Sequence, residues 1–581
     1  MKFRGFGKRD ELAEEVAVGR AEEPSQPEHV GEKNLRDDIG EDRSADDENI
    51  LEKIPTPDVQ DGVKKVEAVT LTWTKNELIL AYGFLTAYVT SSFYLLPLTS
   101  TTSIVSGVVG GVMRLPTAKF VDLIGRAEGL AIMTGFAVLG ITIPAIGIAN
   151  VETYAAAQVF YWVGFDGMAY TLDVFMADTS SLKNRALVFA FSTTPYIVTT
   201  FIGPRAAQSF LETSGWPWGY GTYAIVTPVI VVPIITLLYL NQRKAVKKGL
   251  LVKEKSGRTV TQSINFYFWE FDVIGLILIC AGFVLILLPF SLASYQVKGY
   301  KAPMIIAMFV IGGVSLIAFC LYEKYFAPKS FISFQLLTDR SVLGACMLSN
   351  FLFISFYLWD GYFNAYLQVV HSLSVTNAGY VTNIYSIGSC FWGVILAGLI
   401  RLFGRFKYLA LAHLCLQILG VGLMIHFRQP NIGIGYVVMC QIFIAFGGGG
   451  LVICEDMAVM AAAPHAGVAS MLALIALFSS VGGGIGSAIA GAIYTNKFPA
   501  ALEAALPGNA TLNAELYGSL PTQLLYPIGS PERTAVIYAY GQSMWYLTIA
   551  STVFLVPCFV FIGVWKDFKV KELRQVKGRV A

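Results

Sequence analysis

Apolar stretches of roughly 20 residues recur along this chain from about residue 77 to about residue 564. A bilayer requires roughly 20 apolar residues for each helix that crosses it. Only 14% of the 581 residues are charged and 55% are apolar, which is too apolar for a soluble protein of several domains. The sequence therefore predicts an all-α polytopic membrane protein, with the lipid bilayer as its main partner.

About 14 transmembrane helices are expected from these stretches. They lie near 77–98, 102–121, 128–149, 153–176, 185–208, 219–240, 272–292, 302–323, 342–368, 377–400, 406–426, 433–456, 466–495 and 541–564. The longest basic stretch between them, residues 241–271, follows the sixth helix. Two six-helix bundles with two inserted helices are the arrangement expected of a fourteen-helix major facilitator fold, in which two repeats rock about a central site.

This interpretation divides the chain into a series of segments. They are an acidic, disordered cytosolic tail (1–70), an N-terminal six-helix bundle (71–240), a cytosolic linker (241–271), two inserted helices (272–340), a C-terminal bundle (341–564) with a long outer loop (496–540), and a basic cytosolic tail (565–581). The tail is called acidic because residues 1–67 hold 19 acidic and 11 basic side chains.

The distribution of Lys and Arg predicts the orientation. Basic residues concentrate in the even-numbered gaps between helices, including the cluster from Arg243 to Arg258, and such gaps face the cytosol. The odd-numbered gaps are poor in them. The only Asn-x-Ser/Thr sequon, at Asn509, falls in a gap that this rule places outside, where it is a candidate glycosylation site.

The gap after the second expected helix contains a candidate inner gate. Residues 118–126, AKFVDLIGR, resemble the major facilitator loop signature, except that Leu123 replaces the usual basic residue. Gly125 permits a tight turn, while Asp122 and Arg126 can pair with helix ends and charges of the neighbouring bundle. The alternative interpretation is an ordinary charged interior loop.

Ionisable side chains inside the expected spans are candidates for proton coupling, because such residues are costly in lipid and usually line a pathway. Asp166 and Asp173 lie seven residues apart on one face of the fourth helix, and Arg114 on the second helix is a possible partner. A fixed ion pair is the alternative. In the second half the corresponding acids are Asp360 and Glu455, whereas Asp456 lies nearer the cytosolic end.

Glycines and aromatic residues cluster near these acids. The run from Gly447 to Gly450 suggests either a flexible helix or close helix packing, and the glycines from Gly482 to Gly491 favour packing. Aromatic side chains on the acid-bearing helices are candidates for a substrate cavity, although most such residues face lipid or core. They are Tyr161, Trp162, Tyr170, Trp359, Tyr362 and Tyr366.

No motif indicates an enzyme, a cofactor or a nucleic acid. The eight cysteines all fall in apolar stretches, so no disulfide framework is implied. The five histidines form no pair at metal-ligand spacing, and no nucleophile, base and orienting residue occur together. We expect a monomeric carrier with no metal site, no cofactor and no nucleic-acid partner.

Several ordered segments resemble the siderophore-iron transporter family of fungi. They are VEAVTLTWTK, AYVTSS, RLPTAKFVDLIGRAEG, YWVGFDGMAYTLDVFMADTSSLKNRA, WDGYFNAYLQVVHSLSVTNAGY, AGAIYTNKFPAAL and YPIGSPERTAVIYAYG. The resemblance implies uptake of a ferric siderophore of the hydroxamate type by proton symport, at the plasma membrane or in endosomal vesicles. One departure is the apolar run Tyr94–Leu98, where the family usually has polar residues.

The resemblance also assigns residues. Asp173 and Glu455 match the family's helix acids, and Asp360 with Tyr362 matches its WDxYF element. Tyr517 and Tyr526 lie in the long outer loop and could touch the chelate first. A multidrug antiporter of the same fold remains an alternative, although the glycines that flank its signature are missing around Gly203-Pro204. Relatives that carry haem or glutathione are a further alternative.

Overall fold

The computed structural model describes residues 100–146, 151–197, 200–201, 216–248, 259–292, 296, 298–328, 338–463 and 467–571. The first expected span, at 77–98, and the acidic tail lie outside the described residues. All described residues belong to one compact unit, Lys53–Ala581. Every element in the described part of the chain is helical.

Each long span-like helix among the described residues coincides with an expected span. The helices up to the linker are α4 (Ser100–Ile124), α5 (Arg126–Ala145), α6 (Val151–Thr179), α7 (Leu182–Thr193) and α9 (Trp216–Lys247). The next are α10 (Val260–Glu270), α11 (Val273–Leu292), the short 3₁₀ turn η2 (Gly299–Lys301) and α12 (Pro303–Tyr325).

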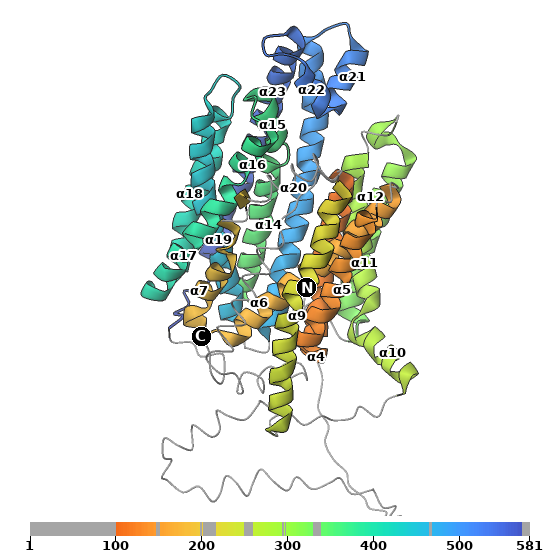
Figure 1. The fold of residues 1–581 in the computed structure, drawn as a ribbon, viewed down its shortest axis with the longest axis vertical. Helices are drawn as coiled ribbons and strands as arrows, with labels where there is room; N and C mark the ends of the chain where they lie inside the picture. The colour runs from red at the N-terminus through yellow and green to blue at the C-terminus, as the bar shows by residue number, and fades with distance from the viewer. Residues whose placement is uncertain are drawn as a thin grey trace, which may run out of the picture. The chain divides into compact units, whose positions relative to one another are not determined.

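The helices of the second half follow the same expected order. They are α14 (Arg340–Asp360), α15 (Phe363–Val370), α16 (Val375–Thr382), α17 (Ile384–Phe403), α18 (Lys407–Phe427), α19 (Ile434–Ala462), α20 (Val468–Ala505), α21 (Ala510–Gly518), α22 (Leu520–Leu525), α23 (Pro531–Leu555) and α24 (Cys558–Gly563). Figure 1 shows α20 running beside α14, with α21 and α22 beyond its C-terminal end.

Among the described residues, 10 helical stretches are long and apolar enough to cross a membrane. Each of them coincides with an expected span, and α4, α6 and α7 stand where three further spans are expected. Three stretches each combine two consecutive helices, such as α14 with α15 in Arg340–Val370. The chain is therefore a multi-pass membrane protein.

Glycines let neighbouring helices approach closely. A Cβ atom added to Gly140 of α5 would lie 2.3 Å from the backbone nitrogen of Tyr161 in α6. One added to Gly164 of α6 would lie 2.1 Å from the backbone nitrogen of Ala137 in α5. Because real Cβ atoms do not approach so closely, a side chain at either position would push α5 and α6 apart.

The four glycines from Gly447 to Gly450 also serve packing. They lie inside α19, which continues unbroken from Ile434 to Ala462. A Cβ atom added to Gly447 would lie 2.6 Å from the backbone nitrogen of Gln417. One added to Gly450 would lie 2.1 Å from Cδ2 of His413. Of the two sequence-based interpretations, close helix packing is confirmed. The break falls elsewhere, between α14 and α15.

The two halves of the chain pack directly against each other. Helix α4 contacts α20 and the inserted helix α11, and α7 contacts α17. The main hydrophobic core includes residues of both halves, for example Val112 of α4, Val174 of α6 and Met471 of α20. The two halves therefore meet in this main core, and a second apolar cluster lies among α5, α6 and α9.

Several helix ends differ from the sequence-based boundaries. Helix α9 continues to Lys247, α20 continues to Ala505 and α23 begins at Pro531, ten residues before the expected start at 541. Hydropathy locates only the apolar part of a helix, and these extensions are polar. The expected outer loop 496–540 thus consists mostly of helix, and the expected linker 241–271 contains α10.

Candidate functional site

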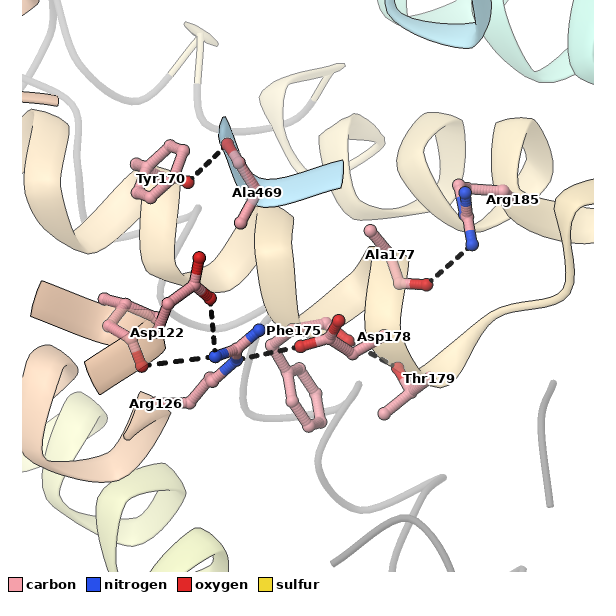
Figure 2. Close-up of polar contacts among 10 residues, drawn as sticks. Asp122, Arg126, Tyr170, Phe175, Ala177, Asp178, Thr179, Arg185 and Ala469 are labelled. Carbon is pink, nitrogen blue, oxygen red and sulfur yellow. Dashed lines mark hydrogen bonds and ion pairs between the residues drawn. The ribbon is translucent and has the colours of Figure 1, made fainter. Parts of the chain in front are cut away.

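The candidate inner gate is a cluster of buried charges at the junction of α4, α5 and α6. The Nη1 atom of Arg126 lies 2.9 Å from Oδ1 of Asp122, one helical turn away in sequence, and its Nε atom lies 2.9 Å from Oδ2 of Asp178 on α6 (Figure 2). The Arg126 guanidinium also donates to the Val121 carbonyl at 3.2 Å. All three charged side chains are buried. Such charge-assisted hydrogen bonds have strict geometry, so they fix the C-terminal end of α6 against the α4–α5 turn.

Gly125 makes this arrangement possible. It separates α4 from α5 with φ 127° and ψ 161°, a conformation that only glycine adopts readily. The expected role of Gly125 in a tight turn thus agrees with its geometry. Partners in the neighbouring bundle were expected for Asp122 and Arg126, whereas the ion pairs described above join residues of the first half only. Sequence reasoning missed Asp178, although it stands in the family-like ADTSSLKNRA segment.

Beside this cluster, Tyr170 connects the two halves. Its hydroxyl donates a 2.6 Å hydrogen bond to the carbonyl of Ala469 at the start of α20 (Figure 2). The ring is buried. Near it, Arg185 donates to the carbonyl groups of Ala177 and Ser180 at 2.9 and 3.2 Å, which ties the start of α7 to the end of α6. In this conformation Tyr170 contacts protein, whereas the sequence assigned it to a substrate cavity.

A second charged cluster lies between α4 and α6. Arg114 Nη2 lies 2.7 Å from Oδ1 of Asp166, so the predicted partnership of these helices includes a direct ion pair. Arg114 also interacts electrostatically with Asp173, which lies about two turns after Asp166 on α6, and with Asp456 of α19. The last of these belongs to the other half of the chain. Asp456 therefore belongs to this cluster, whereas from the sequence it was expected nearer the cytosolic end and was assigned no role.

Glu455, next to Asp456, has a different environment. Its side chain is 2% exposed, and one carboxyl oxygen accepts a 2.8 Å hydrogen bond from Ser349 of α14. The Ser349 hydroxyl in turn lies 2.6 Å from that of Ser479 on α20. The second carboxyl oxygen, Oε2, has no hydrogen-bond partner among the described residues. None of the ion pairs described for residues 100–571 involves Glu455.

Asp360 stands where the ninth expected span breaks. Helix α14 ends at Asp360 and α15 begins at Phe363. The buried Arg428, which follows α18, donates to the Trp359 carbonyl that this break leaves free. Its guanidinium carbon lies 4.3 Å from the centroid of the Phe363 ring, and it interacts electrostatically with Asp360. Arg428 was not selected from the sequence as a site residue.

An aromatic cluster follows the break, and Tyr494 of α20 is its centre. The rings of Tyr362 and Tyr494 are stacked with centroids 3.8 Å apart. The Tyr494 centroid lies 6.0 Å from that of Tyr517 in α21 and 4.8 Å from that of Phe498. The structure thus brings together two predicted substrate residues, Tyr362 and Tyr517, through a tyrosine that sequence reasoning did not select.

The other predicted aromatic residues are spread over both halves. Tyr161 packs edge-on against Trp162 with a centroid distance of 5.6 Å on α6. Trp359 and Tyr366 are buried, and the Tyr366 hydroxyl lies 3.1 Å from Nε2 of His371. Tyr526, after α22, is partly buried against the main core. These residues therefore do not form a single aromatic cluster with Tyr362.

Asn509, the sequon residue, is exposed and precedes α21. Its side-chain oxygen accepts a hydrogen bond from the Leu512 amide at 3.2 Å. The described residues contain no group of three or more His, Cys, Asp or Glu side chains that could hold a metal ion.

Comparison with known proteins places the chain in a family. The major facilitator superfamily model matches residues 78–367. The chain is 50% identical to MFS siderochrome iron transporter 1 of Ajellomyces capsulatus, over 94% of this chain and 95% of that protein. It is 44% identical to siderochrome iron transporter 2 of Aspergillus fumigatus over 99% of both chains, and 42% identical to the siderophore iron transporter mirB of Emericella nidulans over 91% of both.

The helical fold, the membrane spans and the matched family model define a transporter of the major facilitator superfamily, not an enzyme. Within that superfamily, the chain belongs to the family of fungal siderophore-iron transporters. The resemblance found in the sequence is therefore confirmed.

Proposed function

We propose that this transporter imports ferric siderophores of the hydroxamate type by proton symport, with alternating access from the two sides of the membrane. The relatives whose names state siderochrome or siderophore iron transport support the substrate, because they match nearly the whole chain. A hydroxamate chelate is bulky and rich in acceptor oxygens, which suits the hydroxyl groups and rings around Tyr494.

The observation that carries the coupling proposal is the cluster of Arg114, Asp166 and Asp173 with Asp456 across the two halves. Arg114 forms an ion pair with Asp166 and also interacts electrostatically with Asp173 and Asp456. When the halves move apart, the distance from Arg114 to Asp456 must change, and so must the cost of keeping Asp456 and Asp173 ionised. Proton binding and the movement of the halves are thereby linked.

Glu455 and Asp360 serve as further proton-coupling residues in this proposal. Burying a carboxylate without a positive partner costs free energy, so the buried Glu455 is a candidate for taking up and releasing a proton during the cycle. Asp360 interacts with Arg428 and lies near the aromatic cluster around Tyr494. In this proposal it couples substrate entry to the charged residues of the transport pathway. Asp122 and Arg126, held by Asp178, close the inner end of the first bundle.

The proposed topology has both tails in the cytosol and Asn509 outside, in the plasma membrane or in endosomal vesicles, with the transporter acting as a monomer. The exposure of Asn509 supports this arrangement. Glycosidase treatment should reduce the apparent mass of the native protein and leave the Asn509→Gln variant unchanged. A tag at residue 575 that antibodies reach on intact cells would contradict the topology.

Transport in proteoliposomes tests the proposal. We expect a pH gradient to drive accumulation of a labelled ferric hydroxamate siderophore, and Asp173→Asn to abolish accumulation while downhill exchange continues. The amide keeps the shape of the side chain but cannot titrate. Glu503→Gln, which removes an exposed carboxyl at the end of α20, is the matched control and should retain accumulation. Undiminished pH-driven accumulation by Asp173→Asn would exclude this residue as the proton carrier.

A further inference from the structure

Helix α10 has an apolar face that is exposed along most of its length and meets α4 only at its C-terminal end, near Phe271. Val260, Ile264, Tyr267, Phe268 and Phe271 follow one another at helical spacing, so their side chains share one face. Val260 is 78% exposed and Ile264 is 65% exposed. Together with Ser263 and Val273, this face lines an open groove of about 540 Å³.

The helix is well formed in spite of its exposure. Thr259 and Gln262 form a reciprocal capping box at its N-terminus. Its C-terminus is held by Lys119 of α4, whose Nζ donates to the Glu270 carbonyl at 3.0 Å, and by Phe271, whose ring lies 6.2 Å from that of Phe120. The opposite side carries the polar Gln262 and Asn265, together with the aromatic Phe266 and Trp269 nearer the C-terminus. A helix fixed at one end against the bundle, with an exposed apolar face, needs a partner for that face.

The position of α10 indicates which partner that is. The helix ends at Glu270 and the membrane span α11 begins at Val273, so α10 joins the bundle at the end where this span begins (Figure 1). Aromatic side chains are typical of the membrane–water interface. Exposed basic residues end the preceding helix α9, including Arg243, Lys247 and Lys248. This combination of an apolar face and basic charges fits a surface of anionic lipid.

We propose that α10 is an interfacial helix whose apolar face inserts into the cytosolic leaflet, and that the basic end of α9 selects anionic lipid headgroups there. This surface is separate from the transport site and does not depend on the substrate or on proton coupling. It depends only on the cytosolic placement of the segment between α9 and α11. Lipid composition would then set how firmly the connection between the two halves is held.

Hydrogen exchange of the full-length protein in nanodiscs tests this proposal. We expect the α10 amides to exchange more slowly in discs of mixed phosphatidylserine and phosphatidylcholine than in phosphatidylcholine alone. Each basic residue near an anionic surface contributes about 1 kcal/mol, which is roughly fivefold in the binding constant. Lys247→Glu with Lys248→Glu should therefore remove most of the difference between the two lipid mixtures.

Matched variants separate the apolar face from general destabilisation. Ile264→Glu with Phe268→Glu should make α10 exchange fast in both lipids. Gln262→Glu with Asn265→Glu places the same charges on the opposite face, keeps a capping-box residue and should preserve the protection. Equal exchange in the two lipid mixtures would overturn the proposal. Loss of protection on deletion of residues 1–60 would also overturn it, because the acidic tail would then be the partner.

Discussion

Arg126 and Arg405 both form ion pairs with aspartate, but their surroundings differ. The Arg126 side chain is 4% exposed and lies between two buried carboxyl groups. The Arg405 side chain is 47% exposed, and its guanidinium lies 3.0 Å from Asp567. Water screens the second pair, whereas removal of one partner from a buried cluster leaves charge without compensation. The two pairs should therefore contribute very differently to stability.

Replacement of these arginines by alanine tests that difference. Arg126→Ala should lower the free energy of unfolding by about 3 to 5 kcal/mol, because it leaves Asp122 and Asp178 facing each other in the interior. Arg405→Ala should cost only about 0 to 1 kcal/mol. Thermal unfolding of the purified variants in detergent gives both values. Similar losses in the two variants would contradict the assigned role of burial.

Asp339, at the start of α14, allows a prediction about pH. Its side chain accepts a hydrogen bond from the Ser341 amide at 2.8 Å and pairs with Lys566. Burial alone would raise the pKa of this carboxyl, but the hydrogen bonds from Lys566 and from the backbone lower it below its ordinary value. A lowered pKa stabilises the fold above the unfolded-state value of about 3.9, and this stabilisation is lost as the pH falls through the folded-state pKa.

Asp339→Ala should therefore destabilise the protein at neutral pH by about 1 kcal/mol, the usual contribution of an N-cap. Asp339→Asn keeps a capping oxygen and should lose less. The difference between wild type and Asp339→Ala should stay constant between neutral pH and pH of about 5, and should shrink only in stronger acid. A difference that disappears near neutral pH would show that the carboxyl has no lowered pKa.

At the scale of elements, Gly125 fixes how α4 turns into α5. Its φ of 127° strains any residue with a side chain. Gly125→Ala should lower the free energy of unfolding by about 1 to 3 kcal/mol. Gly135→Ala, within α5, is the control, because nothing lies within 4 Å of an added Cβ and alanine favours helix by roughly 1 kcal/mol. If both variants lose stability equally, backbone strain is not the cause.

The positions of the helices could be predicted from the sequence because lipid imposes a simple rule on their composition. Each apolar stretch from 102–121 onward has a helix in the described residues. The ends were harder to predict. Glu532 and Arg533 are charged, yet they lie in the first turn of α23, which Ser530 caps. Likewise α10 lacks the length of a span, so its helical structure was not apparent in a basic linker.

The candidate site could be predicted only where the sequence is unusual. Arg114 and Asp166 stand out because each is a charge in an apolar stretch, and they do form an ion pair. Asp178 sits beside a polar interior turn, where an acid is ordinary. Tyr494 is one of 28 tyrosines, and nothing local distinguishes it. Their roles arise from contacts between distant helices, which a single sequence does not specify.

At the scale of the whole molecule, contacts between the halves decide which side of the transporter is open. Helix α6 reaches α20 through Tyr170, and α7 reaches α17 near the same end of the bundle. A carrier that works by alternating access must break such contacts in every cycle. The buried hydrogen bond from Tyr170 to Ala469 is therefore expected to favour the described conformation over one in which the inner ends separate.

Tyr170→Phe removes that hydrogen bond and keeps the ring. A buried hydrogen bond contributes about 0.5 to 1.5 kcal/mol, so the population with separated inner ends should rise by roughly twofold to tenfold. Spin labels on Lys183→Cys of α7 and Leu402→Cys of α17 would report the separation, after the exposed Cys320 and Cys415 are replaced by serine. Tyr408→Phe, which alters a tyrosine that is 62% exposed, is the control and should leave the distances unchanged. If Tyr170→Phe gives the same distance distribution as Tyr408→Phe, the hydrogen bond to Ala469 does not bias the halves, and the closure must rest on the apolar contacts of α4 with α11 and α20.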